Sequence, residues 1–264
     1  MMITIFTIAG SAVYAAEIPV SDQDQLITSN DWTEISNLQD EMKKEEPDAT
    51  IDYDKALKVY VDCNLIKLQT ADTKKLTSAL ESANYVWVIP FKMEKTYGMF
   101  TVAKGLPLRE EAKSVLTKAE QEEVKNHAGK WMITEIAEHT VEPYYDILLE
   151  KREALSDCTR VVLVGSQPGM RQPVALGMDD ETARIWISLG YQYPVMEKIP
   201  ETQNVESGVY SFDSVAEISD TYIEDSEVST GVGVQSRSSM KYVAGIGIVS
   251  VSYTHLRAHE TDQY

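Results

Sequence analysis

The best cluster of metal-binding residue types in the sequence consists of Glu135, Glu138 and His139. Carboxylate and imidazole groups are zinc ligands, and Glu135 and His139 share a face on either a strand or a helix. On a strand, however, Glu138 points the other way, and no second His or Cys lies nearby in the sequence. A catalytic zinc site needs three protein ligands, so we predict no metal here and retain Glu135 and His139 only as candidates.

Two acidic stretches could supply either calcium ligands or a pair of catalytic carboxylates. Asp52 and Asp54 follow several other acids, but the glycine and the closing glutamate of an EF-hand loop are missing, which favours a solvated connector. The acids at 179–181 fit a hairpin turn, where such residues are common. Two carboxylates act as general acid and base only when the fold brings them together, and sequence spacing does not show this.

Motifs for a catalytic nucleophile or a phosphate-binding loop are incomplete. A nucleophile elbow around Ser166 would need glycine at the positions held by Val164 and Pro168, so this stretch is predicted to be a turn. The glycines Gly231 and Gly233 precede no predicted helix and have no Lys-Ser/Thr partner. We therefore predict no catalytic residue and no cofactor, and the ligand-binding residues stay unknown.

The end of the chain carries two histidines in a spacing that could bind metal. His255 and His259 lie four residues apart beside Glu260, which places two imidazoles on one face of a helix. The surrounding residues 251–264 resemble translated adapter sequence, however, so we interpret them as a non-native tail. The preceding residues 242–250 are apolar and contain glycine, which is typical of either a truncated membrane anchor or a final strand.

Residues 1–16 resemble a secretory signal peptide, because an apolar run from residue 2 ends there in small residues. The run is too short to span a bilayer, which takes about 20 residues. A positively charged start is missing, since no Lys or Arg precedes Lys43. Either the true start lies upstream, or these residues form a buried strand of an intracellular protein; we expect export. Residues 17–30 are polar and are predicted to be a mobile lead-in.

The composition excludes one class of partner and leaves the state of the cysteines open. The chain has 264 residues and a formal net charge of −18, which opposes binding to nucleic acid because phosphates must be neutralised by Lys and Arg. Its two cysteines, Cys63 and Cys158, match neither a zinc pattern nor a redox motif. In an exported protein they could form one disulfide, and otherwise they are buried thiols.

The elements that must position these residues centre on a predicted hairpin. Large apolar side chains occupy alternate positions over 85–93, and a second strand-like run at 97–103 follows a short polar gap. Helices are predicted at 31–46, 70–83, 109–128 and 141–155. Further strands are predicted at 55–68, 131–137, 160–164, 172–177 and 182–189.

Several local signals refine these elements. Asp31 is the predicted cap of the first helix, and Thr117 with Glu120 forms a capping box that breaks the third. Gly129 stands where a helix end requires positive φ. A bend is predicted near Asn64, because the apolar face of its strand changes sides there.

The composition changes after Pro200. Residues 201–230 hold eight acids and no Lys or Arg, and the following residues add Gly and Ser, which predicts an acidic Ser/Thr-rich linker at 201–241. The folded part is then one α+β domain at 31–200. It should contain a mainly antiparallel sheet of about seven strands packed by about four helices.

From these features we expect a non-enzymatic, exported module of the cell envelope that binds a protein, glycan or peptide, or that forms surface structure. A truncated C-terminal helix could tether it to the membrane. The alternative from a different class is an extracellular hydrolase that uses carboxylates from separate strands. A third hypothesis is an intracellular folded protein, if the first residues are a core strand.

Overall fold

The computed structural model describes residues 18–225, apart from 141, 166, 168, 169, 171, 191–195 and 201–203. The predicted signal segment (1–16), anchor (242–250) and non-native tail (251–264) therefore lie outside the described residues. The described part is a single α+β domain around one sheet of ten mostly antiparallel strands, which confirms the predicted fold class. No helix within it is both long enough and apolar enough to cross a membrane.

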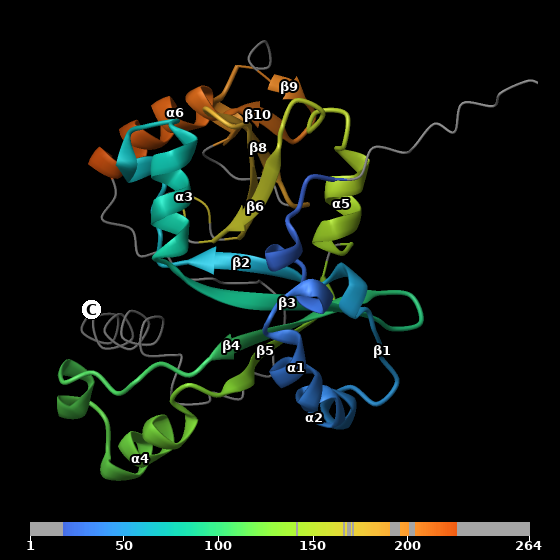
Figure 1. The fold of residues 1–264 in the computed structure, drawn as a ribbon, viewed down its shortest axis with the longest axis vertical. Coiled ribbons are helices and arrows are strands. Elements are labelled where there is room, and N and C mark those ends of the chain that lie inside the picture. The colour runs from blue at the N-terminus through green and yellow to red at the C-terminus, as the bar shows by residue number, and fades with distance from the viewer. Residues whose placement is uncertain are drawn as a thin grey trace, which may run out of the picture.

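The sheet has the strand order β5-β4-β3-β2-β6-β7-β8-β10-β9, and β1 pairs with β3 beyond the end of β2 (Figure 1). The strands are β1 (Thr50–Ile51), β2 (Leu57–Val61), β3 (Asn84–Lys92), β4 (Tyr97–Lys104), β5 (Trp131–Thr140), β6 (Arg160–Val164), β7 (Val174–Met178), β8 (Ala183–Ser188), β9 (Asn204–Glu206) and β10 (Val209–Ser211). The helices are α1 (Trp32–Ile35), α2 (Gln39–Glu45), α3 (Thr73–Glu81), α4 (Lys118–His127), α5 (Tyr144–Glu150) and α6 (Phe212–Asp225).

The predicted central hairpin is confirmed as β3 and β4, which pair antiparallel from Val86 with Ala103 to Lys92 with Tyr97. Its apolar face is completely buried at Trp87, because α1 and α2 pack over this half of the sheet. The period-two pattern therefore identifies both the strands and the face that enters the core.

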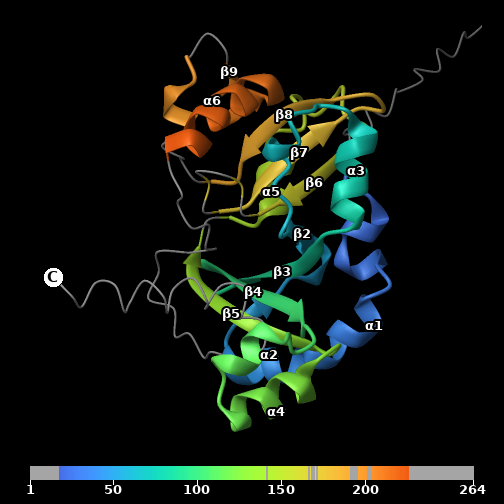
Figure 2. The same ribbon diagram turned by 90° about the vertical axis from the view of Figure 1, so that its left-hand side faces the viewer.

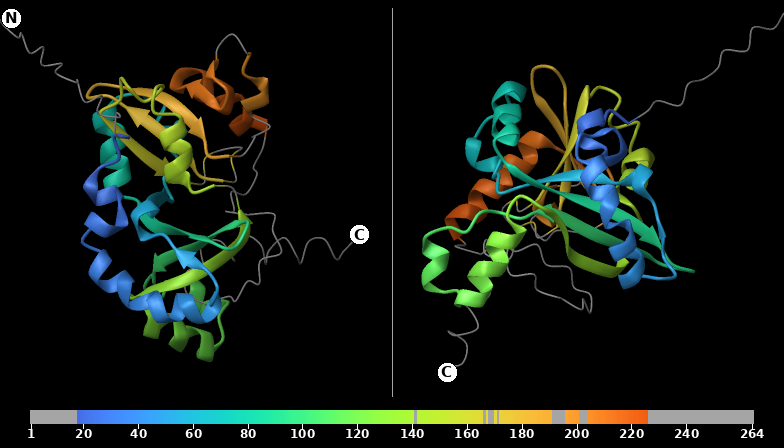
Figure 3. Two further views of the ribbon diagram at one scale, coloured as in Figure 1. Left: turned by 90° about the vertical axis from the view of Figure 1, so that its right-hand side faces the viewer. Right: turned by 60° about the horizontal axis from the view of Figure 1, so that its bottom comes forward.

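Helices cover both faces of the sheet in three separate packing groups. One face carries α1 and α2 over β3–β5, and α3 with α6 over β6–β8. The opposite face carries α5 over the central strands. Figure 2 shows α3 and α6 in front of the β6–β8 half, and the left panel of Figure 3 shows α5 in front of it from the other side.

The sheet divides at its centre, where β2 and β6 form the one parallel pairing among the named strands over just two residue pairs. Figure 1 shows β2 running across the view and β6 rising steeply from it. Beyond these two residue pairs a gap separates β2 from β6, and the N-terminal segment 18–26 lies in it. Val20 bridges Val161 in parallel, and the Leu26 amide donates to the Ala56 carbonyl at 3.1 Å. The segment thus bridges both halves of the sheet.

The structure therefore differs from the mobile lead-in predicted at 17–30. Residues 22–24 and 26–28 form two 3₁₀ turns, and Leu26 is fully buried. The physical reason is the gap between β2 and β6, which exposes strand edges that the segment pairs with. Polar composition alone does not reveal that these edges are available.

The second half of the sheet also continues past residue 200, within the predicted linker at 201–241. β10 pairs with β8, and Phe212 and Val215 of α6 belong to the same core cluster as the buried leucines of α3. Five acids of the predicted linker lie in α6, so its acidic residues belong largely to an amphipathic helix that packs on the sheet.

Two further predictions need correction. The strand predicted at 55–68 ends at Val61, and Asp62 follows with a φ of 59° before a 3₁₀ turn at Ile66–Leu68. Asp31 makes no cap hydrogen bond with α1, because its carboxylate is occupied by side chains of β3.

Local signals around α4 are confirmed. The Thr117 hydroxyl accepts from the Glu120 amide at 3.3 Å, and the Glu120 carboxylate accepts from the Thr117 amide at 2.7 Å. Gly129 follows the helix with a φ of +77°, a conformation that costs glycine little.

Candidate functional site

A surface groove of about 580 Å³ opens where β1 and the 3₁₀ turn Tyr53–Lys55 meet the far end of the β3–β4 hairpin and the residue before α5. Concave sites that combine aromatic rings with a few polar groups are typical of ligand binding. The aromatic and charged residues that line this groove are Trp32, Tyr53, Phe91 and Tyr97, with Asp52, Asp54, Lys55 and Lys92.

The aromatic rings of the groove are held by contacts within the protein. Trp32 and Tyr53 meet edge to face, with ring centroids 5.2 Å apart. The Tyr53 hydroxyl also donates to the Met42 sulfur at 3.7 Å, and burial raises the pKa of Tyr53. Phe91 is 1% exposed and packs on Phe100 with centroids 4.7 Å apart. A ligand would therefore meet the already ordered rings of Trp32 and Tyr53, which lowers the entropy cost of binding.

Charges of both signs line the same groove. The Lys55 ammonium donates to Asp146 at 2.8 Å and lies 3.7 Å from Asp52. The hydrogen bond to Asp146 raises the pKa of Lys55 above its usual value, against the opposing effect of burial. The Lys92 ammonium lies 5.7 Å from the centroid of the Tyr97 ring. The groove can thus offer hydrogen-bond donors and acceptors beside its aromatic surfaces.

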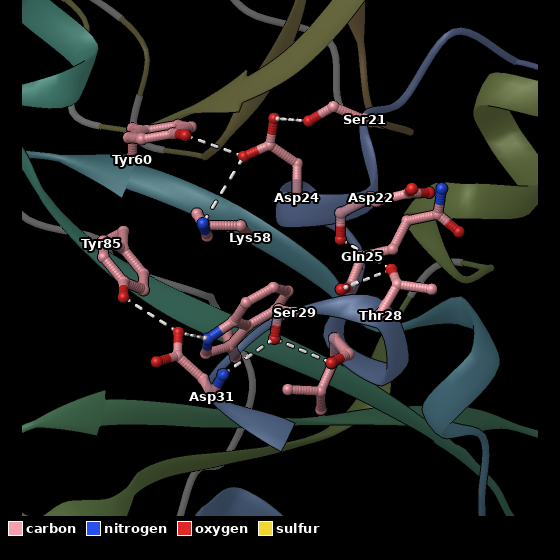
Figure 4. A network of polar contacts seen from close by, with 12 residues as sticks. Ser21, Asp22, Asp24, Gln25, Thr28, Ser29, Asp31, Lys58, Tyr60 and Tyr85 are labelled. Carbon is pink, nitrogen blue, oxygen red and sulfur yellow. Dashed lines mark hydrogen bonds and ion pairs between the residues drawn. The ribbon is translucent and has the colours of Figure 1, made fainter. Parts of the chain in front are cut away.

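A second polar group, which we call the Asp24 cluster, lies between β2 and β6 and consists of Ser21, Asp24, Lys58, Tyr60 and Arg160. Figure 4 shows the first four of these residues. Asp24 is 2% exposed and accepts from the Tyr60 hydroxyl at 2.7 Å and the Ser21 hydroxyl at 2.6 Å. Arg160 Nη2 donates at 3.2 Å to the oxygen that also accepts from Ser21, and the Lys58 ammonium lies 3.7 Å from the oxygen that accepts from Tyr60. These contacts join the N-terminal segment to both halves of the sheet.

Asp31 lies on the opposite side of Lys58 from Asp24 (Figure 4). One oxygen of Asp31 accepts from the Tyr85 hydroxyl at 2.9 Å and from Trp87 Nε1 at 3.0 Å. The Lys58 ammonium lies 4.5 Å from the centroid of the Tyr85 ring and 5.2 Å from that of Trp87. At 5.8 Å, Tyr60 supplies a third ring. Lys58 is thus surrounded by aromatic faces, which attract cations through the ring quadrupole.

Burial dominates the ionisation of this region. It lowers the pKa of Lys58, and the carboxylates of Asp24 and Asp31 oppose that shift only in part. Burial also raises the pKa of Tyr60 and of Tyr85, in each case reinforced by the neighbouring carboxylate. Both phenols therefore stay protonated at neutral pH and act as hydrogen-bond donors.

The structure places the predicted metal candidates on β5. Burial raises the pKa of Glu135, and a hydrogen bond with Thr101 opposes this shift. Glu138 is exposed, and the side chain of His139 lies outside the description. Within the described ranges, no group of three or more His, Cys, Asp or Glu side chains is arranged to hold a metal ion.

The other sequence candidates have separate positions. Asp52 and Asp54 both line the groove, so the stretch interpreted as a solvated connector contributes to a concave surface. Asp179 closes the hairpin turn as predicted, since its carboxylate accepts from the amides of Thr182 and Glu181, which lower the pKa of Asp179. Residues 231–233, Ser166, His255 and His259 lie outside the described residues.

Cys63 and Cys158 are both free and buried, and they belong to core clusters on different faces of the sheet. Burial raises the pKa of each thiol to about 11. The structure therefore corresponds to the buried-thiol alternative.

Sequence reasoning missed both the aromatic groove and the Asp24 cluster. One signal was available: Lys58 interrupts an apolar strand between Leu57 and Val59, so a charge on a core strand needed an explanation. No comparable signal marks Asp24, because its partners lie 36 and 136 residues away in the chain.

Comparison with known proteins gives no external guide to these two sites. Neither the protein-family models, nor the curated proteins, nor the solved structures contain a match to this chain. The inferences that follow therefore rest on the residues and their contacts.

Proposed function

We propose that the chain is a non-enzymatic binding module of the cell envelope and that its protein, peptide or glycan ligand occupies the groove beside β1. The observation that carries this proposal is the set of partly exposed aromatic rings, Trp32, Tyr53 and Tyr97, next to charged side chains. Aromatic side chains provide a large contact area at low entropy cost, and the adjacent polar groups fix a ligand's orientation.

Export is the second part of the proposal. It is supported by residues 1–16, in which an apolar run ends in small residues, as is typical of a signal peptide. The Ser- and Gly-containing composition of residues 226–241 and the apolar composition of residues 242–250 support attachment at the membrane. Expression of the full chain in a bacterium, followed by fractionation and mass measurement, tests this. We expect a mature chain that lacks residues 1–15 or 1–16, and an intact chain in the cytosol would contradict export.

The groove is tested with the full chain on glycan and peptide arrays, followed by titration of each hit. Replacing Trp32 with alanine should weaken binding at least about tenfold, because buried aromatic contacts are common hot spots. Val115→Ala provides a control, since Val115 is 75% exposed and does not line the groove. Equal affinities of the Trp32→Ala and Val115→Ala variants would reject the groove as the binding site.

One observation favours the hydrolase alternative, namely that Asp52 and Asp54 line the same groove. The same titrations distinguish the two functions when the recovered ligand is analysed by mass spectrometry. A binding module returns the ligand intact. A ligand that is cleaved by the unmodified chain, but not by the Asp52→Asn or Asp54→Asn variant, would establish the hydrolase instead.

A further inference from the structure

The groove beside β1 results from an irregularity along one edge of β3. β1 and β2 both pair antiparallel with this edge, with Ile51 opposite Phe91 and Leu57 opposite Val88. Five residues therefore separate Ile51 from Leu57, whereas two separate Val88 from Phe91. The longer side bulges away from β3 as the 3₁₀ turn Tyr53–Lys55, and the three residues of this turn line the groove.

The bulge leaves the outer side of β1 open. The Asp52 amide donates to the Pro90 carbonyl at 2.9 Å. Since hydrogen-bonded positions alternate in an antiparallel pair, the N–H and C=O groups of Ile51 point away from β3. No other strand of the described part pairs with them. Ile51 lines the groove, which therefore offers a backbone donor and acceptor of the kind that an added peptide strand uses.

The groove also has an excess of negative charge. Asp54 is exposed and makes no ion pair or hydrogen bond with another described residue. Asp52 lies 3.7 Å from the Lys55 ammonium, which donates its hydrogen bond to Asp146 instead. Lys92 is the other cation that lines the groove, so these three carboxylates outnumber the two ammonium groups by one. The chain as a whole has a net charge of −18, which attracts cationic partners.

Two aromatic rings beside this charge are available to a cation. Trp32 and Tyr53 meet at an angle of 66°, and no Lys or Arg among the described residues lies over either ring. The Tyr97 ring, by contrast, already has the Lys92 ammonium 5.7 Å from its centroid. Tyr53 directly precedes Asp54 in the 3₁₀ turn, so a ring and an unpaired carboxylate come from adjacent residues. Ring faces and carboxylates both attract ammonium and guanidinium groups.

On the basis of the function proposed above, we infer that the ligand of the groove is an extended peptide that carries a lysine or arginine side chain. The peptide backbone pairs with the N–H and C=O groups of Ile51. The basic side chain lies against Trp32 and Tyr53, and its charge faces Asp54. A neutral glycan has neither a strand edge for Ile51 nor a positive charge for Asp54.

Fluorescence anisotropy with the full chain and two labelled peptides tests the charge. Both peptides have the sequence acetyl-Ser-Thr-Val-Xaa-Val-Thr-Ser, where Xaa is arginine in one and glutamine in the other. We expect the arginine peptide to bind about fivefold more tightly, which is the order of an exposed ion pair. This advantage should shrink in about 0.5 M NaCl, because salt screens exposed charges.

Two variants locate the effect. Asp54→Asn should weaken binding of the arginine peptide about fivefold and leave the glutamine peptide unchanged. Glu123→Gln is the matched control, because it changes the net charge equally but lies exposed on α4 outside the groove. It should leave both affinities unchanged. N-methylation of alternate residues blocks one edge of the peptide at a time, and blocking only one of the two edges should abolish binding.

The possible failures are distinguishable. Equal affinities of the two peptides, an Asp54→Asn effect no larger than that of Glu123→Gln, or no binding of either peptide would overturn the inference. The proposed function would still stand if an array ligand, such as a glycan, lost affinity on the Trp32→Ala change. If Trp32→Ala alters the binding of no ligand, the groove is rejected and the inference fails with it.

Discussion

Replacing Asp24 with asparagine tests whether the Asp24 cluster holds the two halves of the sheet together. The change keeps the shape of the side chain but removes the negative charge that faces Arg160 at 3.2 Å and Lys58 at 3.7 Å. It also converts one acceptor oxygen into an NH₂ donor that faces hydrogen-bond donors. Asp24 is 2% exposed, so water cannot replace the lost interactions.

The expected magnitude follows from the exposure of the partners. Removing one member of a buried ion pair costs roughly 3–5 kcal/mol, because the remaining charge stays buried. The side chains of Arg160 and Lys58 are 19% and 10% exposed, so some of that cost is relieved by solvent. We expect the free energy of unfolding to fall by about 3 kcal/mol, which corresponds to about 6–12 °C in Tm for a domain of this size.

Urea unfolding of the wild type and the variant, followed by circular dichroism, measures this change. Asp22→Asn is the matched control, since Asp22 lies in the same 3₁₀ turn but is exposed. It should change the free energy of unfolding by less than about 0.5 kcal/mol. If Asp24→Asn has an effect as small as that of Asp22→Asn, the cluster does not stabilise the junction. A Lys58→Met change added to Asp24→Asn should recover part of the loss, because it removes an uncompensated charge.

Three further predictions test other parts of the fold. Gly98→Ala should destabilise the protein by about 1–3 kcal/mol in urea unfolding, because the added Cβ would overlap the Phe91 ring and lie 2.8 Å from the Ala137 carbonyl oxygen. Gly165→Ala, whose Cβ would meet only ordinary contacts at 3.6 Å, should be nearly neutral, and equal effects of the two would contradict the packing argument. Thr117→Ala should cost about 1 kcal/mol through loss of the capping box, whereas Thr117→Ser should keep most of it, as thermal unfolding would show. Burial raises the pKa of Cys63 and Cys158 to about 11, so the thiolate forms appear only as the pH approaches that value. A thiol reagent at pH 8 without reductant should therefore react with neither cysteine in the folded protein and with both after unfolding, and no reaction in either state would indicate a disulfide.

The sequence alone determined the elements whose signals lie within a few residues. Alternation around Trp87 identified the β3–β4 hairpin and its buried face, and Thr117 with Glu120 identified the start of α4. The turn at Asp179 was also predictable. In these places the stabilising interaction connects neighbours in the chain, so residue type and spacing contain the necessary information.

Tertiary structure alone decided how polar residues are used when their partners are distant. Asp31 has the sequence features of a helix cap, yet its carboxylate binds Tyr85 and Trp87, which lie 54 and 56 residues away. Asp24 lies in a polar stretch without a motif and becomes buried because its segment bridges β6 at Val161 and β2 at Leu57. A buried carboxylate must be paired, and the partners available to it are set by which strands the completed sheet brings together.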